Sequence, residues 1–284
     1  SIDNYFKVFR EDDGNLGSDP PYIGGVSVPD RLYGGLAVAQ VVKAVVSLHP
    51  HLSPHTVNYK FVSPATASIP IKFKLSQFNE GKMAAITIFQ SGKVVGMAHI
   101  QSSTEPEVLD SSPFLCPHYN SPNEYASTDE LARSGQSHKF IYLQELSYYP
   151  MEIRPIETPL FPKSATNRHS TWLRMKPQFH DSLKRSDGLF VVLFMSDFTM
   201  LQVASEMYER ANVKIKTISS LHHSLRVHET DLDPLSWFLV VVECHVISHR
   251  RGRLEALIFD ESRKCVMSVV QEGYFLPAPT QSKI

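Results

Sequence analysis

One carboxylate of this sequence lies in an apolar segment, where a charged side chain costs folding free energy unless it has a partner or a function. Asp197 is in Phe190–Leu201, a segment that is otherwise almost entirely apolar. Desolvation in such surroundings raises the pKa of a carboxyl group and makes it a better proton acceptor than a surface aspartate. The residues alone leave two interpretations open: a general base in an active site, or a buried charge that a backbone or arginine partner satisfies.

Other residues whose side chains could bind a metal, a cofactor or phosphate form no recognisable site. His245 and His249 are four apart, but no third ligand is evident, so we expect no metal site. The sequence has no G-x-S-x-G elbow, P-loop or G-x-G-x-x-G motif, and we expect no cofactor. The densest cationic cluster, His249–Arg253, contains Gly252 and favours a solvated hairpin turn over a phosphate site.

Composition narrows the possible partners. The chain has 284 residues, 20% of them charged, and a net charge of −1, which argues against nucleic acid or an anionic membrane as a partner. Its three cysteines have no C-x-x-C spacing, which argues against a disulfide framework and a structural zinc site. Gly188–Ser205 is apolar, but its polar residues favour a core helix over a membrane span, so we predict no membrane insertion.

The elements around Asp197 follow from hydrophobic patterning. Gly34 and Gly35 open a segment to Leu48 whose only strongly polar positions are Gln40 and Lys43, which predicts a helix enclosed on all sides. Strand-like runs rich in β-branched and aromatic residues follow it. They are Thr56–Val62, Ile69–Phe78, Met83–Gln90 and Val94–Gln101.

The same order recurs in the second half. Gly188–Arg210 is predicted as a second apolar helix, and four more strand-like runs follow it. Superposing the halves brings Gly35 onto Asp197 and Gln101 onto Gln271, which indicates an internal duplication. The predicted divisions are a first unit at 1–103, a linker at 104–148 with a short polar helix near Thr128–Arg133, a second unit at 149–276 and a tail at 277–284.

A helix wrapped by an antiparallel sheet and duplicated in one chain resembles the double hotdog fold, an α+β architecture. Six short motifs between about residues 20 and 276 also resemble the acyl-CoA thioesterase II family, which includes peroxisomal acyl-CoA thioesterases. These motifs are Leu32-Tyr-Gly-Gly35 followed by Gln40, His55-Thr-Val-Asn-Tyr-Lys-Phe-Val-Ser-Pro64, Ile153-Arg-Pro155, Ser196-Asp197, Ser220-Leu-His-His-Ser224 and Val270-Gln-Glu-Gly273.

The resemblance implies three catalytic residues, Asp197, Ser220 and Gln271. Ser220 replaces a threonine of several relatives and keeps the hydroxyl. A thioester has a good leaving group, so one carboxylate and a positioned water suffice for its hydrolysis. Ser220 and Gln271 offer hydroxyl and amide groups that orient such a water. With Asp197 in only the second half, we expect one active site per chain.

Three further residues are predicted to touch the substrate. Gly34 and Gly35, at the start of the first helix, would let a thioester carbonyl approach backbone N–H groups and the positive helix end. The alternative is a glycine pair needed only for a tight turn. His55 matches a histidine of the family.

Two other functions stay open: a hotdog 2-enoyl-CoA hydratase or dehydratase, with His222 or His223 beside Asp197, and a non-catalytic acyl-CoA binding module. The ending Ser282-Lys283-Ile284 is one aliphatic change from a peroxisomal address read by an import receptor. We therefore expect a peroxisomal location, or otherwise a cytoplasmic one. By resemblance, we expect a homo-oligomer.

Overall fold

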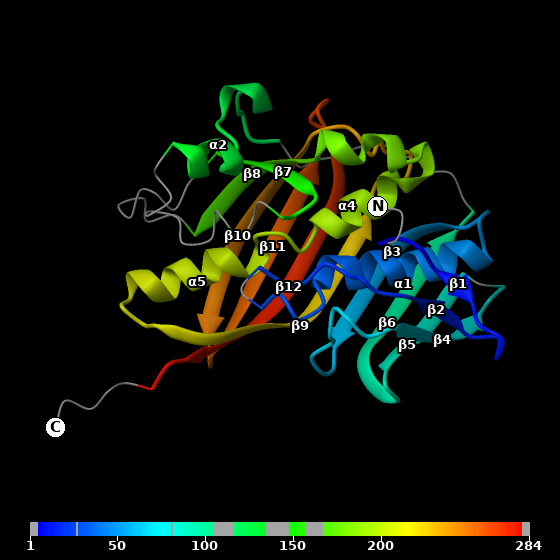
Figure 1. Cartoon of the computed structure of the whole chain (residues 1–284). Helices are drawn as coiled ribbons and strands as arrows, with labels where there is room; N and C mark the ends of the chain where they lie inside the picture. Colours follow the sequence, from blue (N-terminus) through cyan, green and yellow to red (C-terminus); the bar gives the residue numbers. More distant parts are fainter. Residues whose placement is uncertain are drawn as a thin grey trace.

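The protein is built on one large antiparallel sheet, shown by a computed structural model. The structure describes residues 5–26, 28–80, 82–104, 116–134, 148–156 and 167–279. Twelve strands pair in the order β1-β2-β4-β5-β6-β3-β9-β12-β11-β10-β8-β7. The strands of the first half occupy one side and those of the second half the other, and they meet where β3 pairs with β9 (Figure 1).

The first half contributes six strands, and β3 to β6 correspond to the four predicted runs. Their bounds are β1 Phe9–Arg10, β2 Leu16–Ser18, β3 Ser53–Phe61, β4 Ile71–Phe78, β5 Met83–Gln90 and β6 Lys93–Ser103. The second half contributes the other six. Their bounds are β7 Met151–Pro155, β8 Arg168–Met175, β9 Ile215–Val227, β10 Phe238–Ser248, β11 Arg251–Phe259 and β12 Cys265–Pro277.

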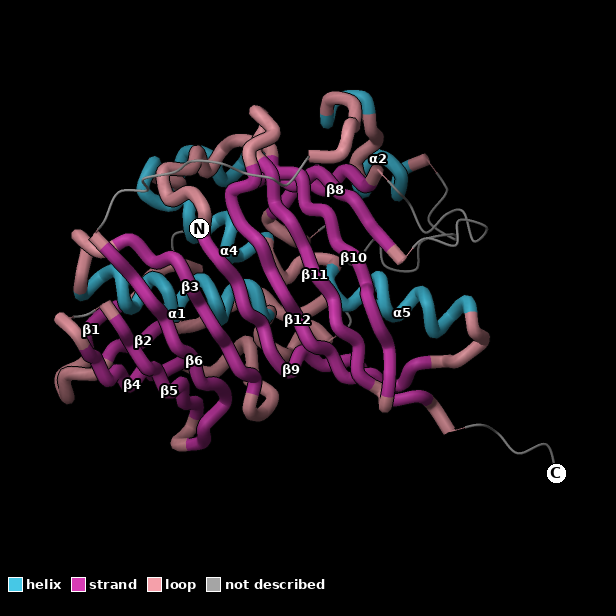
Figure 2. Tube along the Cα trace, turned by 180° about the vertical axis from the view of Figure 1, so that it is seen from behind, coloured by secondary structure: helices cyan, strands magenta, loops and turns pink. Residues whose placement is uncertain are grey.

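The longer helices lie on one face of this sheet, and among the described residues the opposite face is uncovered over β3 to β6 of the first half (Figure 2). Over β8, β10 and β11 that face carries a second buried cluster, in which Trp172, Leu239 and Phe259 pack with Tyr119 and Tyr125. Helix α1, Gly34–Leu48, is buried along most of its length, as its apolar sequence predicts. Its one strongly polar central residue, Gln40, is completely buried, and its amide nitrogen donates to the Tyr5 carbonyl and the Ser18 hydroxyl. The enclosed helix is confirmed.

The predicted second helix, Gly188–Arg210, is wrong in one respect, because it is broken. Helix α4 covers Gly188–Met195, and α5 covers Met200–Arg210. Thr199, between them, has a left-handed backbone with φ of 64°. Phe194 explains part of the break: its carbonyl accepts from the Tyr33 hydroxyl at 2.9 Å, whereas the Phe198 N–H turns back to Met195. A continuous helix would pair Phe194 with Phe198.

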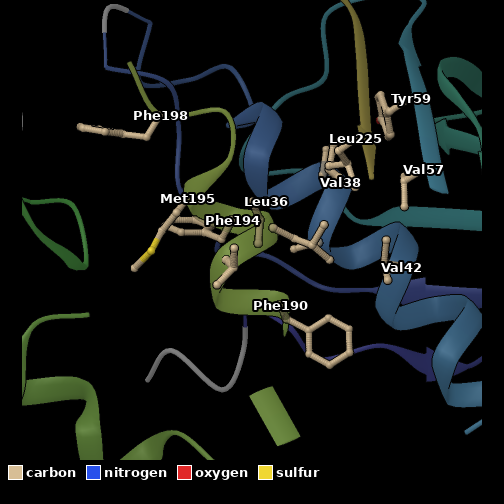
Figure 3. Close-up of a cluster of buried hydrophobic side chains, with 14 of the residues drawn as sticks. Leu36, Val38, Val42, Val57, Tyr59, Phe190, Phe194, Met195, Phe198 and Leu225 are labelled. Carbon is tan, nitrogen blue, oxygen red and sulfur yellow. The ribbon is translucent and has the colours of Figure 1, made fainter. Parts of the chain in front are cut away.

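The core is continuous between the halves. Helix α1 packs against α4, while α5 packs on β9 to β12. Figure 3 shows side chains of α1, α4, β3 and β9 meeting in one cluster, among them Leu36, Val57, Phe194 and Leu225. The segment Arg185–Arg210 has the length and composition of a membrane span, but 78% of its most apolar window is buried within the protein.

The superposition of Gln101 on Gln271 is wrong by one residue. Gln101 points to the open face of the sheet and is exposed, whereas Gln271 points to the helix-covered face and is completely buried. In β6 the buried face is occupied by Ile100 and Ser102, the two neighbours of Gln101. Because side chains alternate along a strand, an error of one residue exchanges the two faces. The first half therefore lacks an equivalent of this glutamine.

The region between the units is partly described. Helix α2, Thr128–Arg133, matches the predicted short polar helix, and Ser127 and Glu130 form a capping box at its start. One short helical turn precedes α2, and two further ones precede α4. They are η2 Pro122–Glu124, η4 Pro177–Ser182 and η5 Arg185–Asp187. The predicted unit boundaries stay a prediction, and Ser282-Lys283-Ile284 lies outside the described residues.

Candidate active site

Asp197 lies in the break between α4 and α5, where it faces the first turn of α1. The N-cap of α1, Tyr33, provides no side-chain cap, and the first turn contains no acidic residue. Asp197 fills this role from another part of the chain, because its carboxylate accepts a hydrogen bond from the backbone N–H of Gly35. An anion at the positive end of a helix is stabilised. The partner that a buried carboxylate needs is thus supplied by the first half.

Gln271 brings the three predicted catalytic residues together. Its amide nitrogen donates to Asp197 Oδ1 at 2.8 Å and to Ser220 Oγ at 2.8 Å. These side chains come from β12, the helix break and β9, so no two of them share an element. Both hydrogens of the amide are used, one on the carboxylate and one on the hydroxyl. The predicted cluster of Asp197, Ser220 and Gln271 therefore exists as one hydrogen-bonded unit.

A β-bulge in β9 determines which side chains face this cluster. Glu272 pairs with His222 and Gly273 pairs with Ser220, so Leu221 is an extra residue without an opposite partner on β12. In a regular strand, residues three apart point to opposite faces. The extra residue places Ser220 and His223 on the same face, while His222 lies on the other.

His223 is also a member of this site; the sequence left open whether His222 or His223 lies beside Asp197, and the structure places His223 there. It is completely buried, and its Nδ1 lies 3.0 Å from Gln271 Oε1. Its Nε2 lies 3.0 Å from the hydroxyl of Ser196, which is also completely buried. The motif that contains Ser220 and His223 was a signal, but only the bulge shows that both point inward.

Burial shifts the titration of two groups in opposite directions. It raises the pKa of Asp197 to about 6, although hydrogen bonds from Gln271 and Gly35 act to lower it. It lowers the pKa of His223 to about 4, although its hydrogen bond to Gln271 acts to raise it. Near neutral pH the site therefore holds an ionised carboxylate and a neutral imidazole. A carboxylate with a pKa near 6 is well suited to accept a proton from water.

The two glycines are close to Asp197 but do not present a free pair of N–H groups. A Cβ on Gly34 would lie 2.6 Å from Asp197 Oδ2, and a Cβ on Gly35 would collide with the Phe194 carbonyl oxygen. The Gly35 N–H is already engaged with Asp197. Close helix packing explains why both positions lack a side chain, and the predicted oxyanion role of Gly34 and Gly35 stays a prediction.

His55 is not brought to this cluster. It is exposed and lies beside Thr56, which pairs with Arg226, six residues along β9 from Ser220. At about 3.3 Å per residue this is a separation of roughly 20 Å. His249 and Arg250 form the β10–β11 turn, and Arg251 and Arg253, at the start of β11, pair with Glu272 and Glu255, as expected for a solvated cluster. Within the described ranges no group of three metal-binding side chains comes together, and the absence of a cofactor stays a prediction.

Solved structures share this architecture along nearly the whole chain. An acyl-CoA thioesterase II, TesB2, from Mycobacterium marinum aligns with a TM-score of 0.74 and 18% identity over 99% of both chains. A tesB protein of Mycobacterium avium subs. paratuberculosis aligns with a TM-score of 0.76 and 18% identity over 98% of this chain and 100% of that one. The dehydratase domain of PpsC from Mycobacterium tuberculosis is more distant, with a TM-score of 0.56 and 10% identity over 97% and 100%. The fold is thus an α+β double hotdog.

The sequence itself identifies the family. Residues 123–275 match the family described as acyl-CoA thioesterase C-terminal domain. No curated protein matches the chain. The matched part covers more than half of the chain and contains Asp197, Ser220 and Gln271. The chain belongs to the acyl-CoA thioesterase family and is a thioester hydrolase that acts on acyl-CoA.

Proposed function

We propose that this chain hydrolyses fatty acyl-CoA to the free acid and coenzyme A with a water molecule that Asp197 activates and that Ser220 and Gln271 orient. The observation that carries the proposal is the Gln271 amide, which links the Asp197 carboxylate and the Ser220 hydroxyl in one unit. The first half has Gly35 and an outward Gln101 at the positions first matched to Asp197 and Gln271. We therefore propose one active site per chain.

Asp197 acts as the general base. Water attacks the thioester carbonyl carbon while its proton passes to the carboxylate, and the C–S bond of the tetrahedral intermediate then breaks to release the coenzyme A thiolate. A thiolate needs little help to leave, so the proton on Asp197 is free to return to solvent or to the sulfur. The raised pKa near 6 leaves the carboxylate ionised at neutral pH and basic enough for this transfer.

Ser220 holds the water rather than attacking the thioester itself. Among the described residues, its hydrogen-bond partner is the Gln271 amide, for which Ser220 is the acceptor. The hydroxyl hydrogen is therefore available to donate to water. The imidazole of the site, His223, is bound to Gln271 and Ser196, so it is not placed to take the Ser220 proton. This arrangement differs from a serine nucleophile with an adjacent histidine base.

A thiol-release assay over a chain-length series of saturated acyl-CoA tests the proposal. Wild type is expected to release coenzyme A, and Asp197→Asn is expected to lower kcat by about a thousandfold or more with little change in KM, because the base is lost and the shape kept. Asp260→Asn, in a surface turn, is the matched control and keeps wild-type rates. Turnover by Asp197→Asn within threefold of wild type would contradict the mechanism.

The same protein sample distinguishes the alternative functions. A hydratase consumes 2-enoyl-CoA without releasing thiol, while a binding module shows no turnover of either substrate. The structure disfavours the hydratase, because Gln271 lies between His223 and Asp197, so that no direct Asp–His pair forms.

Location and assembly are separate proposals. Peroxisomal import through Ser282-Lys283-Ile284 rests on the sequence of these three residues. A fluorescent protein fused before the tail is expected to enter peroxisomes, and removal of the three residues to abolish entry. Homo-oligomer formation rests on the family resemblance, and light scattering at assay concentration tests it.

A further inference from the structure

The Gln271 amide can work only in one orientation. Its nitrogen must face Asp197 and Ser220, as it does here at 2.8 Å from each. Rotation by 180° would place its oxygen against the Asp197 carboxylate, where two negative atoms repel each other. An amide has nearly the same shape in both orientations, so another group has to select one.

His223 is the residue in contact with the other end of this amide. Its Nδ1 lies 3.0 Å from Gln271 Oε1, and both side chains are completely buried. The bulge at Leu221 makes this contact possible, because it turns His223 to the same face as Ser220. The direct pairing of His223 with Gln271 across β9 and β12 keeps the two side chains side by side.

We infer that His223 is a positioning residue: its Nδ1–H donates to Gln271 Oε1 and so holds the amide nitrogen toward Asp197 and Ser220. The inference rests on the proposed function, and it concerns a residue outside the set of three. The hydrogen bond from His223 to Gln271 also fixes the imidazole tautomer, with hydrogen on Nδ1 and an unprotonated Nε2 that faces the Ser196 hydroxyl.

Ser196 completes the arrangement. Its hydroxyl lies 3.0 Å from His223 Nε2 and 2.7 Å from the Leu193 carbonyl oxygen, and its single hydrogen can be donated to either. Donation to Nε2 produces a chain of donors from Ser196 through His223 and Gln271 to Asp197. Since Ser196 directly precedes Asp197, His223 also ties β9 to the segment that carries the general base.

The pH dependence of the site offers a readout that a merely structural histidine would not move. The Gln271 hydrogen bond lowers the Asp197 pKa, so loss of the amide orientation is expected to raise it. The other titratable groups that face Asp197 are the phenols of Tyr33 and Tyr149, and burial raises the pKa of both so that they stay neutral. His222 acts to lower the pKa of His223 and lies on the opposite face of β9.

Three variants test the inference by kcat, KM and the pH profile of kcat/KM. His223→Leu removes the donor and is expected to lower kcat about 10- to 100-fold, leave KM within about twofold, and move the acid limb to higher pH. His223→Asn keeps an N–H near the position of Nδ1 and is expected to restore kcat to within about fivefold of wild type, with the limb unmoved. His222→Leu, the matched control, keeps wild-type values.

Nitrogen NMR of histidine-labelled wild type gives a readout independent of turnover and of the folding of any variant. We expect His223 to show a protonated Nδ1 and an unprotonated Nε2 between pH 5 and 8. A protonated Nε2, or equal losses for the leucine and asparagine variants, would overturn the inference. Failure of the proposed mechanism is distinguishable, because it appears as full activity of Asp197→Asn whatever the tautomer of His223.

Discussion

Helix α1 of the first half runs unbroken from Gly34 to Leu48, whereas the predicted helix of the second half, Gly188–Arg210, is broken into α4 and α5. Helix α1 begins with Gly34 and Gly35, whereas the residues matched to them, Ser196 and Asp197, lie in the break between α4 and α5. The break exposes a carboxylate to β9 and β12, and the intact helix offers that carboxylate its N-terminus. The two halves therefore differ: the second contains Asp197, Ser220 and Gln271, and the first packs the start of α1 against Asp197.

The two halves also differ in backbone strain near the start of these helices. Thr199, next to the site, is a β-branched residue at φ of 64°, a region that such residues rarely adopt. No residue of α1 has a positive φ among the described backbone. Strain of this kind persists where the surrounding structure enforces it, and it concentrates at functional sites.

The largest expected difference between the halves concerns the two glutamines. Gln271→Ala is expected to lower kcat by about a hundredfold, because both Asp197 and Ser220 lose their donor. Gln101→Ala, the formal counterpart in the first half, is expected to stay within about twofold of wild type. The measurement is steady-state thiol release. A comparable loss in the two variants would mean that the first half contributes a second site.

A smaller effect is expected from the contact between α1 and the general base. Gly34→Ala places a methyl group 2.6 Å from the present position of Asp197 Oδ2 and displaces the carboxylate. We expect kcat to fall about tenfold with the thermal midpoint lowered only slightly. Gly25→Ala, whose Cβ would have an ordinary 3.6 Å contact, serves as the control. Equal activity of the two variants would show that the carboxylate is not held against the helix.

The pH profile tests the burial of Asp197. The folded-state pKa is raised from 3.8 to about 6, so the base is lost as the pH falls through 6. We expect kcat/KM to decline below about pH 6 and to reach roughly a tenth of its plateau at pH 5. An ordinary aspartate would keep full activity there. A limb centred below pH 4.5 would show that solvent reaches the carboxylate freely.

The same shift has a consequence for stability. A raised folded-state pKa means that ionisation of Asp197 costs folding free energy, with no cost below about pH 4 and the full cost above about pH 6. Asp197→Asn is therefore expected to be more stable than wild type by about 1–2 kcal/mol at pH 8 and equal to it at pH 4. Urea unfolding at the two pH values measures the difference. Equal stabilities of wild type and Asp197→Asn at pH 8 would show that ionisation of Asp197 costs no folding free energy.

The smallest expected effect is on the free energy of unfolding, and it compares a substitution to glycine in the break with one inside the intact helix α1. Thr199→Gly relieves the left-handed strain and is expected to raise the free energy of unfolding by about 0.5–1 kcal/mol. Ala39→Gly, within the intact helix α1, is expected to lower it by about 1–2 kcal/mol. Midpoints of urea unfolding compare them. A destabilising Thr199→Gly would indicate that the local backbone is not strained.

Several features follow from local sequence. The apolar stretch after Gly34 predicts an enclosed helix, the runs of β-branched residues predict strands, and Ser127 with Glu130 marks the start of α2. The motifs that contain Asp197, Ser220 and Gln271 point to the three groups of the candidate site. These signals are local because they depend on side-chain period, caps and residue type.

Other features were decided only by tertiary contacts. The break at Ser196–Thr199 is explained in part by Tyr33, whose hydroxyl donates to the Phe194 carbonyl from another part of the chain. The wrong match of Gln101 arose because a register error of one residue is invisible in an apolar pattern but reverses the face of a strand. His223 joined the site through a bulge in β9 where this strand pairs with β12. The sequence by itself determined which groups are available for chemistry, and the packing of one half against the other decided which of them meet.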